Sequence, residues 1–180
     1  MSRPVELVPL NCIQCSLPIP AAVNEVAWLC PTCGTSLALT EAGDLIPCEM
    51  RFSANLPPNS KGRPFWVTEG TVKIFRQSYN LIGNSDQEAL QFWSQPRRFF
   101  IPAYECGLEE ILTIGTRWLA DPPPLIEGPK TDFLPITHSA ADVQAFAEFL
   151  ILAVEAARKD KVKEIRFELE LQPPTLWILP

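Results

Sequence analysis

Two pairs of cysteines near the N-terminus have the residue type and spacing of metal ligands. Cys12 and Cys15 are separated by two residues, and Cys30 and Cys33 repeat that spacing after residues 16–29. Such a pair occupies a tight turn whose backbone N–H groups point at the thiolates, and two pairs supply the four sulfurs that tetrahedral Zn²⁺ binds at about 2.3 Å. Because protein thiolates would fill every position and leave none for water, the sequence predicts a structural Zn²⁺ site rather than a catalytic one.

The residues around the cysteines predict the strands that position them. Residues 26–29 indicate a strand leading to Cys30, and residues 36–39 indicate its return partner. Gly34 follows the second pair, where the chain commonly needs a positive φ. The pattern CxxC followed by CPxCG resembles a zinc ribbon over residues 5–48, which implies a small module held by its metal. Ser16 stands where the first turn of such ribbons commonly has glycine.

Iron is the chemical alternative to zinc, because four tetrahedral thiolates suit both metals. Rubredoxins, which hold iron in this way, have a longer gap between their cysteine pairs and a packed aromatic cluster. Trp28 is the only aromatic residue before Cys48. We therefore expect zinc at Cys12, Cys15, Cys30 and Cys33, with iron as the less favoured ion.

Charge argues against a nucleic acid as the partner of this module. Through residue 50 the chain has one basic residue, Arg3, against five acidic ones, and the whole chain carries a net charge of −6. Phosphate backbones are bound chiefly by clustered Lys and Arg side chains. We expect a protein partner instead. The alternative is a nucleic-acid-associated ribbon protein within a larger complex, where another subunit supplies the positive charge.

Three further residues have side chains that could do chemistry: Cys48, Cys106 and His138. Cys48 is an alternative metal ligand, although it stands alone. Cys106 precedes an expected helix whose N-terminus lowers a thiol pKa, but three nearby glutamates act in the opposite direction. His138, the only histidine, lies beside another helix start, where a solvated or capping role is commoner than a catalytic one.

The sequence therefore predicts no catalytic residue. No phosphate loop or GxGxxG motif is present, so we expect no nucleotide or dinucleotide cofactor. An enzyme with a pocket in the C-terminal part, around Cys106, is the second alternative.

The remaining sequence predicts an α+β fold. The chain has 180 residues, 47% of them hydrophobic and 20% charged, which suits a small module attached to a larger domain. We place a zinc-ribbon module at residues 1–50 and an α+β domain at residues 51–180. Strands are expected at 64–76, 97–101 and 165–171, and helices from Ser85 to before Pro96, at 107–119 and from Ser139.

Two apolar features of the C-terminal domain are candidates for docking a partner. The helix after Ser139 has a main apolar stripe, but Phe149 and Leu152 fall on another side, so it is either packed on two sides or open to another protein. The segment 176–179 is either an edge strand or a hydrophobic anchoring tail.

Targeting signals are not visible in this sequence. No N-terminal apolar run has the length of a signal-peptide core, and the most apolar stretch is too short and too charged to span a bilayer. Six cysteines without a signal peptide indicate a reducing compartment. We expect a cytoplasmic, non-catalytic adaptor that acts through protein–protein interaction.

Overall fold

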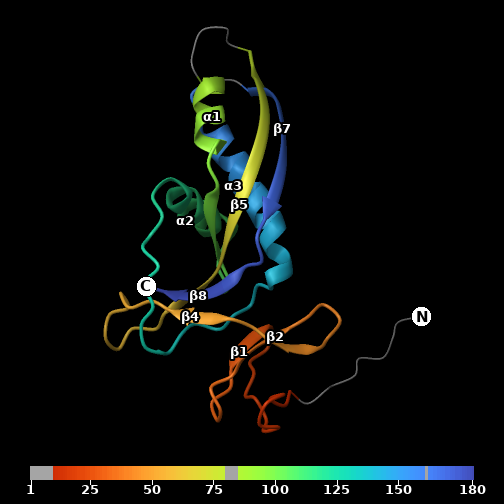
Figure 1. Ribbon diagram of the computed structural model, residues 1–180, viewed down its shortest axis with the longest axis vertical. Coiled ribbons are helices and arrows are strands. Elements are labelled where there is room, and N and C mark those ends of the chain that lie inside the picture. Colours follow the sequence, from red (N-terminus) through yellow and green to blue (C-terminus); the bar gives the residue numbers. More distant parts are fainter. Residues whose placement is uncertain (1–9, 80–84, 161) are drawn as a thin grey trace, which may run out of the picture.

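Two β-sheets and three α-helices form the structure, a computed structural model that describes residues 10–79, 85–160 and 162–180 (Figure 1). The smaller sheet has the order β1-β2-β3, and all its neighbours are antiparallel. Its strands are β1 (Ala27–Leu29), β2 (Ser36–Leu39) and β3 (Leu45–Pro47). The first two strands confirm the hairpin expected around Cys30.

The larger sheet has five strands and carries the helices. Its strands are β4 (Met50–Phe52), β5 (Arg63–Ser78), β6 (Arg97–Pro102), β7 (Val162–Leu171) and β8 (Thr175–Leu179). The helices are α1 (Ser85–Trp93), α2 (Leu108–Ala120) and α3 (Val143–Ala156), and a short 3₁₀ turn, η1 (Ala140–Asp142), leads into α3. The predicted α+β class is confirmed.

The long strand β5 organises the larger sheet. Its first part pairs with β6 on one side and with β8 on the other, and its second part pairs with β7. The strands β7 and β8 follow each other along the same side of β5 and are interrupted at residues 172–174. Pro173 and Pro174 lie in that interruption, where the missing N–H groups of proline end a ladder.

The expectation of an edge strand or a free tail at residues 176–179 is wrong. β8 lies between β4 and β5, pairing parallel with one and antiparallel with the other. The exposed fraction of Leu176, Trp177, Ile178 and Leu179 is at most 5%. This segment is buried core, because β4, far away in sequence, covers its outer side.

Alternating side chains of β5 enter two different cores. Trp66 belongs to a core that includes Leu150 of α3, whereas Phe65 belongs to a second core that includes Trp118 of α2. Phe99 and Phe100 of β6 divide in the same way, because successive side chains of a strand point to opposite faces. The buried side of α2 consists of Ile111, Ile114, Gly115, Trp118 and Leu119, while Leu108 at its start is 53% exposed.

The third helix begins as predicted but is packed on one side only. The Ser139 hydroxyl accepts a hydrogen bond from the Ala141 N–H, and the Asp142 carboxylate accepts one from the Ser139 N–H. Phe149 is 52% exposed and Leu152 is 42% exposed. The expectation that this helix packs on two sides is therefore wrong for the described chain. None of the described helices is long and apolar enough to cross a membrane.

Candidate metal centre

The first cysteine pair lies on a tight turn closed by two backbone hydrogen bonds. The Cys12 N–H donates to the Leu17 carbonyl at 2.9 Å, and the Ser16 N–H donates to the Cys12 carbonyl at 2.8 Å. Ser16 has φ of 60°, the left-handed conformation that glycine adopts most easily. The serine therefore takes the backbone conformation of the glycine it replaces, and the turn is preserved.

The second pair repeats this turn. The Cys30 N–H donates to the Thr35 carbonyl at 2.8 Å, and the Gly34 N–H donates to the Cys30 carbonyl at 2.9 Å. Gly34 has φ of 71°, as predicted from its position after Cys33. The two turns thus have the same backbone hydrogen-bond pattern and a positive φ at the same position. They therefore present two equivalent pairs of thiols.

The antiparallel contacts of the module bring the two turns together. The segments that flank the first turn pair with each other: Asn11 and Pro18 form an isolated antiparallel β-bridge, and the Ile19 N–H donates to the Leu10 carbonyl at 2.8 Å. The second turn joins β1 to β2, so the hairpin itself delivers Cys30 and Cys33. We call residues 10–48, which contain both turns and the small sheet, the cysteine module.

The four sulfurs form a cluster with the dimensions of a tetrahedral metal site. All four Sγ atoms lie within 4.8 Å of one another. Cys12 Sγ is 3.6 Å from Cys33 Sγ, and Cys15 Sγ is 3.7 Å from Cys30 Sγ. A tetrahedron of sulfurs about 2.3 Å from its centre has edges of about 3.8 Å. The residues therefore fit a four-thiolate metal ion.

Burial shields one side of this cluster. Cys12 and Cys30 are each 1% exposed and pack with Ile19, Trp28 and Leu37, while Cys33 is exposed. The apolar group around the sulfurs is small. A module of this size holds few core side chains, and a metal is the usual means of stabilising such a fold.

Hydrogen bonds prepare part of the cluster to bind a cation. The Thr35 hydroxyl, 3.2 Å from Cys33 Sγ, and the Thr35 backbone N–H lower the pKa of Cys33 to about 6. A hydrogen bond from the Cys33 backbone lowers the pKa of Cys30. For Cys15 the Leu17 backbone N–H lowers the pKa, but burial and the other thiols outweigh it and raise the pKa to about 12. Without a cation the cluster thus retains protons, and binding an ion would displace them.

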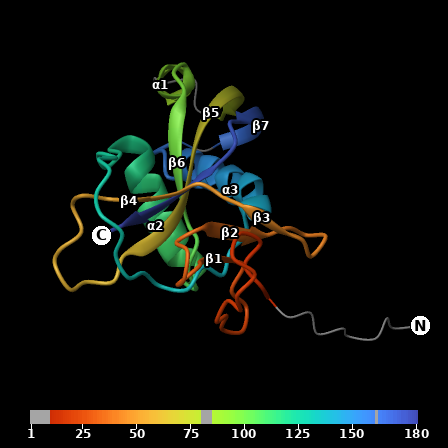
Figure 2. The same ribbon diagram turned by 60° about the horizontal axis from the view of Figure 1, so that its bottom comes forward.

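The cysteine module is acidic and is fixed to the larger domain. The Val26 N–H donates to the Ile136 carbonyl at 2.8 Å, and Ala27, 2% exposed, belongs to the core that contains Trp66. Lys130 of the larger domain donates to the Gly34 carbonyl at 3.0 Å, beside the second turn. Figure 2 shows β1, β2 and β3 lying against one end of the larger domain. Cys12, Cys15, Cys30 and Cys33 are therefore held in a module with a firm attachment.

The other two cysteines lie outside this cluster. Burial raises the pKa of Cys48 to about 11, and burial together with the Glu110 carboxylate raises the pKa of Cys106 to about 11. Cys48 is not among the sulfurs that converge. Both thiols are therefore protonated near neutral pH, which is opposite to what a nucleophilic cysteine requires.

His138 is engaged in backbone contacts. Its Nδ1 lies 2.9 Å from the Pro102 carbonyl oxygen, and its backbone N–H donates to the Ala103 carbonyl at 3.1 Å. Its ring is tilted against Phe146 at 5.5 Å between centroids. These contacts dock the start of α3 on the end of β6, and among the described residues they do not join His138 to Cys106.

A buried ionic cluster that the sequence patterns did not predict lies at the other end of the larger domain. The Arg76 guanidinium of β5 contacts the carboxylates of Asp86, Glu155 and Asp160. The side chains of Arg76 and Glu155 are 1% and 0% exposed, and the Trp93 indole N–H donates to Glu155 at 2.8 Å. The sequence pattern places Glu155 on the narrow polar stripe of α3, whereas the structure buries it completely. The cluster joins β5, α1 and α3.

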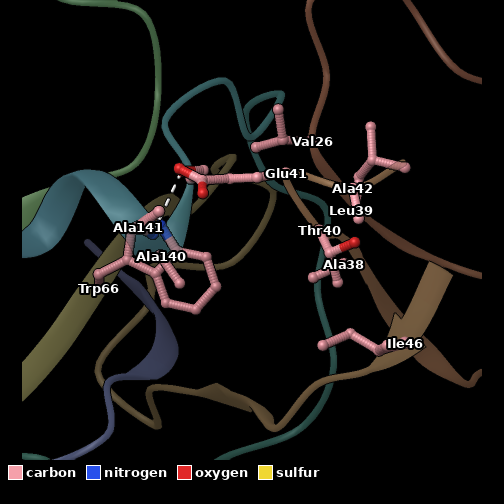
Figure 3. Close-up of a pocket in the computed structure, with 11 residues that line it drawn as sticks. Val26, Ala38, Leu39, Thr40, Glu41, Ala42, Ile46, Trp66, Ala140 and Ala141 are labelled. Carbon is pink, nitrogen blue, oxygen red and sulfur yellow. Dashed lines mark hydrogen bonds between the residues drawn. The ribbon is translucent and has the colours of Figure 1, made fainter. Parts of the chain in front are cut away.

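One cavity lies where the cysteine module meets α3. Its volume is about 470 Å³, and Val26, Leu39, Ile46 and Trp66 are among its lining residues, with η1 at one side (Figure 3). Glu41 is the only charged residue of the described chain that lines it. Among the residues that the structure describes, the lining of this cavity contains no histidine, cysteine or basic side chain.

Fold and site together define an α+β protein with an N-terminal cluster of four cysteines. No family model matches the chain, and neither a curated protein nor a solved structure shows significant similarity to it.

Proposed function

We propose that the chain is a non-catalytic adaptor whose cysteine module is a zinc ribbon, with Cys12, Cys15, Cys30 and Cys33 binding one structural Zn²⁺. The observation that carries this proposal is the convergence of the four Sγ atoms within 4.8 Å on two equivalent turns. Four thiolates would complete the coordination of Zn²⁺ and leave no position for a substrate. The ion would stabilise the module, and the module would present a fixed surface to a protein partner.

Elemental analysis of the purified full chain tests the metal part of this proposal. We expect one zinc per chain, and Co²⁺ in place of Zn²⁺ should give the absorption of a tetrahedral thiolate site. Cys12→Ser should remove the metal, whereas Cys48→Ser, the matched control, should retain it. Iron in place of zinc, or an equal effect of the two variants, would refute the assignment.

The adaptor part rests on the chemistry of the sites and on charge. Cys48 and Cys106 have raised pKa values, and the cavity beside α3 is lined mainly by apolar residues. Residues 10–50 contain four acidic side chains and no basic one, which favours a protein partner over a polyanion. Tight binding of the isolated protein to DNA or RNA in an electrophoretic shift at low salt would contradict this proposal. We expect instead a stoichiometric protein partner that is captured by the metal-loaded chain and lost with Cys12→Ser.

A further inference from the structure

The solvent side of α3 carries an apolar stripe. Ala145, Phe149, Leu152 and Ala156 follow one another at spacings of four, three and four residues, which places them on one side of the helix. All four are exposed, and Phe149 and Leu152 are 52% and 42% exposed. We call these four residues the α3 seam. The buried residues of α3, including Ala147 and Leu150, lie on the opposite side and pack against the sheet.

One charged side chain of α3, Glu148, borders this seam. The charged side chains of α3 are Glu148 and Glu155. Glu155 is fully buried in the Arg76 cluster, and Glu148 accepts a hydrogen bond from Gln144 at 2.8 Å beside the seam. Two large apolar side chains exposed together on one helix face are typical of an interaction site.

Opposite charges stand at the two ends of the seam. Asp142 lies three residues before Ala145 and is exposed, and Lys159 lies three residues after Ala156 and is also exposed. Glu41 adds a further negative charge at the first end, since it lines the cavity next to Ala140 and Ala141 (Figure 3). An antiparallel partner helix that complements this surface must therefore also carry negative charge near its N-terminal end and positive charge near its C-terminal end.

The seam itself meets that requirement. Its side chains are small, large, large and small in chain order, and this order is the same when the helix is read from its C-terminal end. When two copies pair antiparallel about an axis between Phe149 and Leu152, Asp142 of each copy faces Lys159 of the other. A parallel pairing would instead place Asp142 beside Asp142.

We propose that the α3 seam binds the α3 seam of a second copy of this chain, antiparallel about a two-fold axis. Such an interface is isologous, because the same surface is used by both copies. It is short, so the dimer is weak and its population depends on protein concentration. This inference does not depend on the metal of the cysteine module, and its tests use the metal-loaded full chain throughout.

Sedimentation of the full chain over a range of concentrations tests the proposal. We expect a reversible monomer–dimer equilibrium whose dissociation constant rises about tenfold or more in Phe149→Glu, because a charge would then be buried at the axis. Leu90→Glu is the matched control, since Leu90 is a 55% exposed apolar residue on α1 and its change should leave the equilibrium intact. Thermal unfolding of both variants verifies that they fold. A wild-type chain that stays monomeric, or equal effects of the two variants, would overturn the proposal.

A charge exchange tests the antiparallel arrangement. Asp142→Lys and Lys159→Glu should each weaken self-association, because each creates two like-charge contacts in the dimer. An equimolar mixture of the two variants should recover association, because both contacts in the mixed dimer are then complementary. Asp142 also caps the start of the helix through Ser139, but the mixture would not repair a lost cap. Failure of the mixture to recover association would refute this geometry.

Discussion

At the scale of single residues, the backbone conformation after each cysteine pair is the feature on which the metal centre depends. Ser16 and Gly34 both have positive φ and both donate to the first cysteine of their turn. A residue with a Cβ in this conformation costs roughly 1–2 kcal/mol relative to its usual region. The first turn has this cost at Ser16, whereas the second turn does not, because Gly34 has no Cβ.

Exchanging these two residue types should therefore have opposite effects. Gly34→Ala should destabilise the metal-loaded protein by about 1–2 kcal/mol through its positive φ. A Cβ at Gly34 would also lie 3.0 Å from Lys130 Nζ, which has to move. Ser16→Gly should leave stability unchanged or raise it slightly, because relief of φ strain offsets the larger entropy of the unfolded chain. Urea unfolding of the zinc-loaded variants measures both changes, and equal losses would contradict the equivalence of the two turns.

Thiol reactivity is predicted to separate structural from nucleophilic cysteines. The pKa of Cys106 and that of Cys48 are each raised to about 11, so their thiolate fractions are very small at pH 7 and increase about tenfold for each pH unit up to pH 10. Alkylation by iodoacetamide, followed by mass spectrometry of the metal-loaded chain, should show slow modification of both with this pH dependence. A Cys106 that reacts rapidly near neutral pH would favour the enzyme alternative instead.

At the scale of secondary-structure elements, the Arg76 cluster joins three of them. Removing Arg76 leaves the fully buried Glu155 carboxylate with Arg158 as its remaining charge partner at 2.9 Å. Loss of one partner from a buried ion pair commonly costs 3–5 kcal/mol. The cluster is therefore a point where β5, α1 and α3 depend on each other.

The variant Arg76→Met should lower the free energy of unfolding by about 3 kcal/mol, measured by urea denaturation. Arg166→Met is the control, because Arg166 pairs with Glu164 on the exposed side of β7 and its side chain is 74% exposed. We expect the control to change stability by no more than about 0.5 kcal/mol. Equal effects of the two variants would show that the buried cluster does not hold these elements together.

The same cluster predicts a dependence of stability on acid. The hydrogen bond and charge of Arg76 lower the pKa of Asp160 in the folded chain. Its contribution to stability is therefore complete above the unfolded pKa of about 3.9 and is lost as pH falls through the lower folded pKa. Asp160→Asn should lose less stability than the wild type between about pH 5 and pH 2, when both chains are compared in the same metal state. Parallel stability curves for the two chains would contradict this role.

At the scale of the whole molecule, the cysteine module is attached to the larger domain, but its own apolar cluster is small. The Val26 N–H bonds to the Ile136 carbonyl, and Ala27 is buried in the core that contains Trp66. The strands β5 and β8 are packed mainly by side chains of α2 and α3, which form larger apolar clusters than the one around the cysteines. We therefore expect residues 1–50 to depend on the metal more strongly than residues 51–180 do.

Chelation of the metal should reveal this difference. Amide hydrogens of β1, β2 and β3 should lose protection from hydrogen exchange, while those of β5 and β8 keep most of theirs. Cys12→Ser without chelator should reproduce the same pattern, and Cys48→Ser should not. Simultaneous loss of protection in both sheets would show that the chain unfolds as a single unit.

Local features were determined by the sequence alone. The spacing of the cysteines, the glycine after the second pair, the capping box at Ser139 and the alternation of β7 each act over a few residues, so each predicts its turn, helix start or strand directly. The α+β class and the docking candidates followed from them, and two of these candidates, Phe149 and Leu152, are exposed as a docking surface requires.

Only the tertiary structure decided which of these segments are covered. β8 has the composition of an edge strand or a tail, but its burial depends on β4, which precedes it by more than a hundred residues. The partners of Arg76 come from α1, from α3 and from the chain after α3, and the exposure of the α3 seam depends on no described element packing over it. Contacts of this kind join residues that share no local pattern. They are fixed by the packing of the whole chain rather than by the periodicity of any segment.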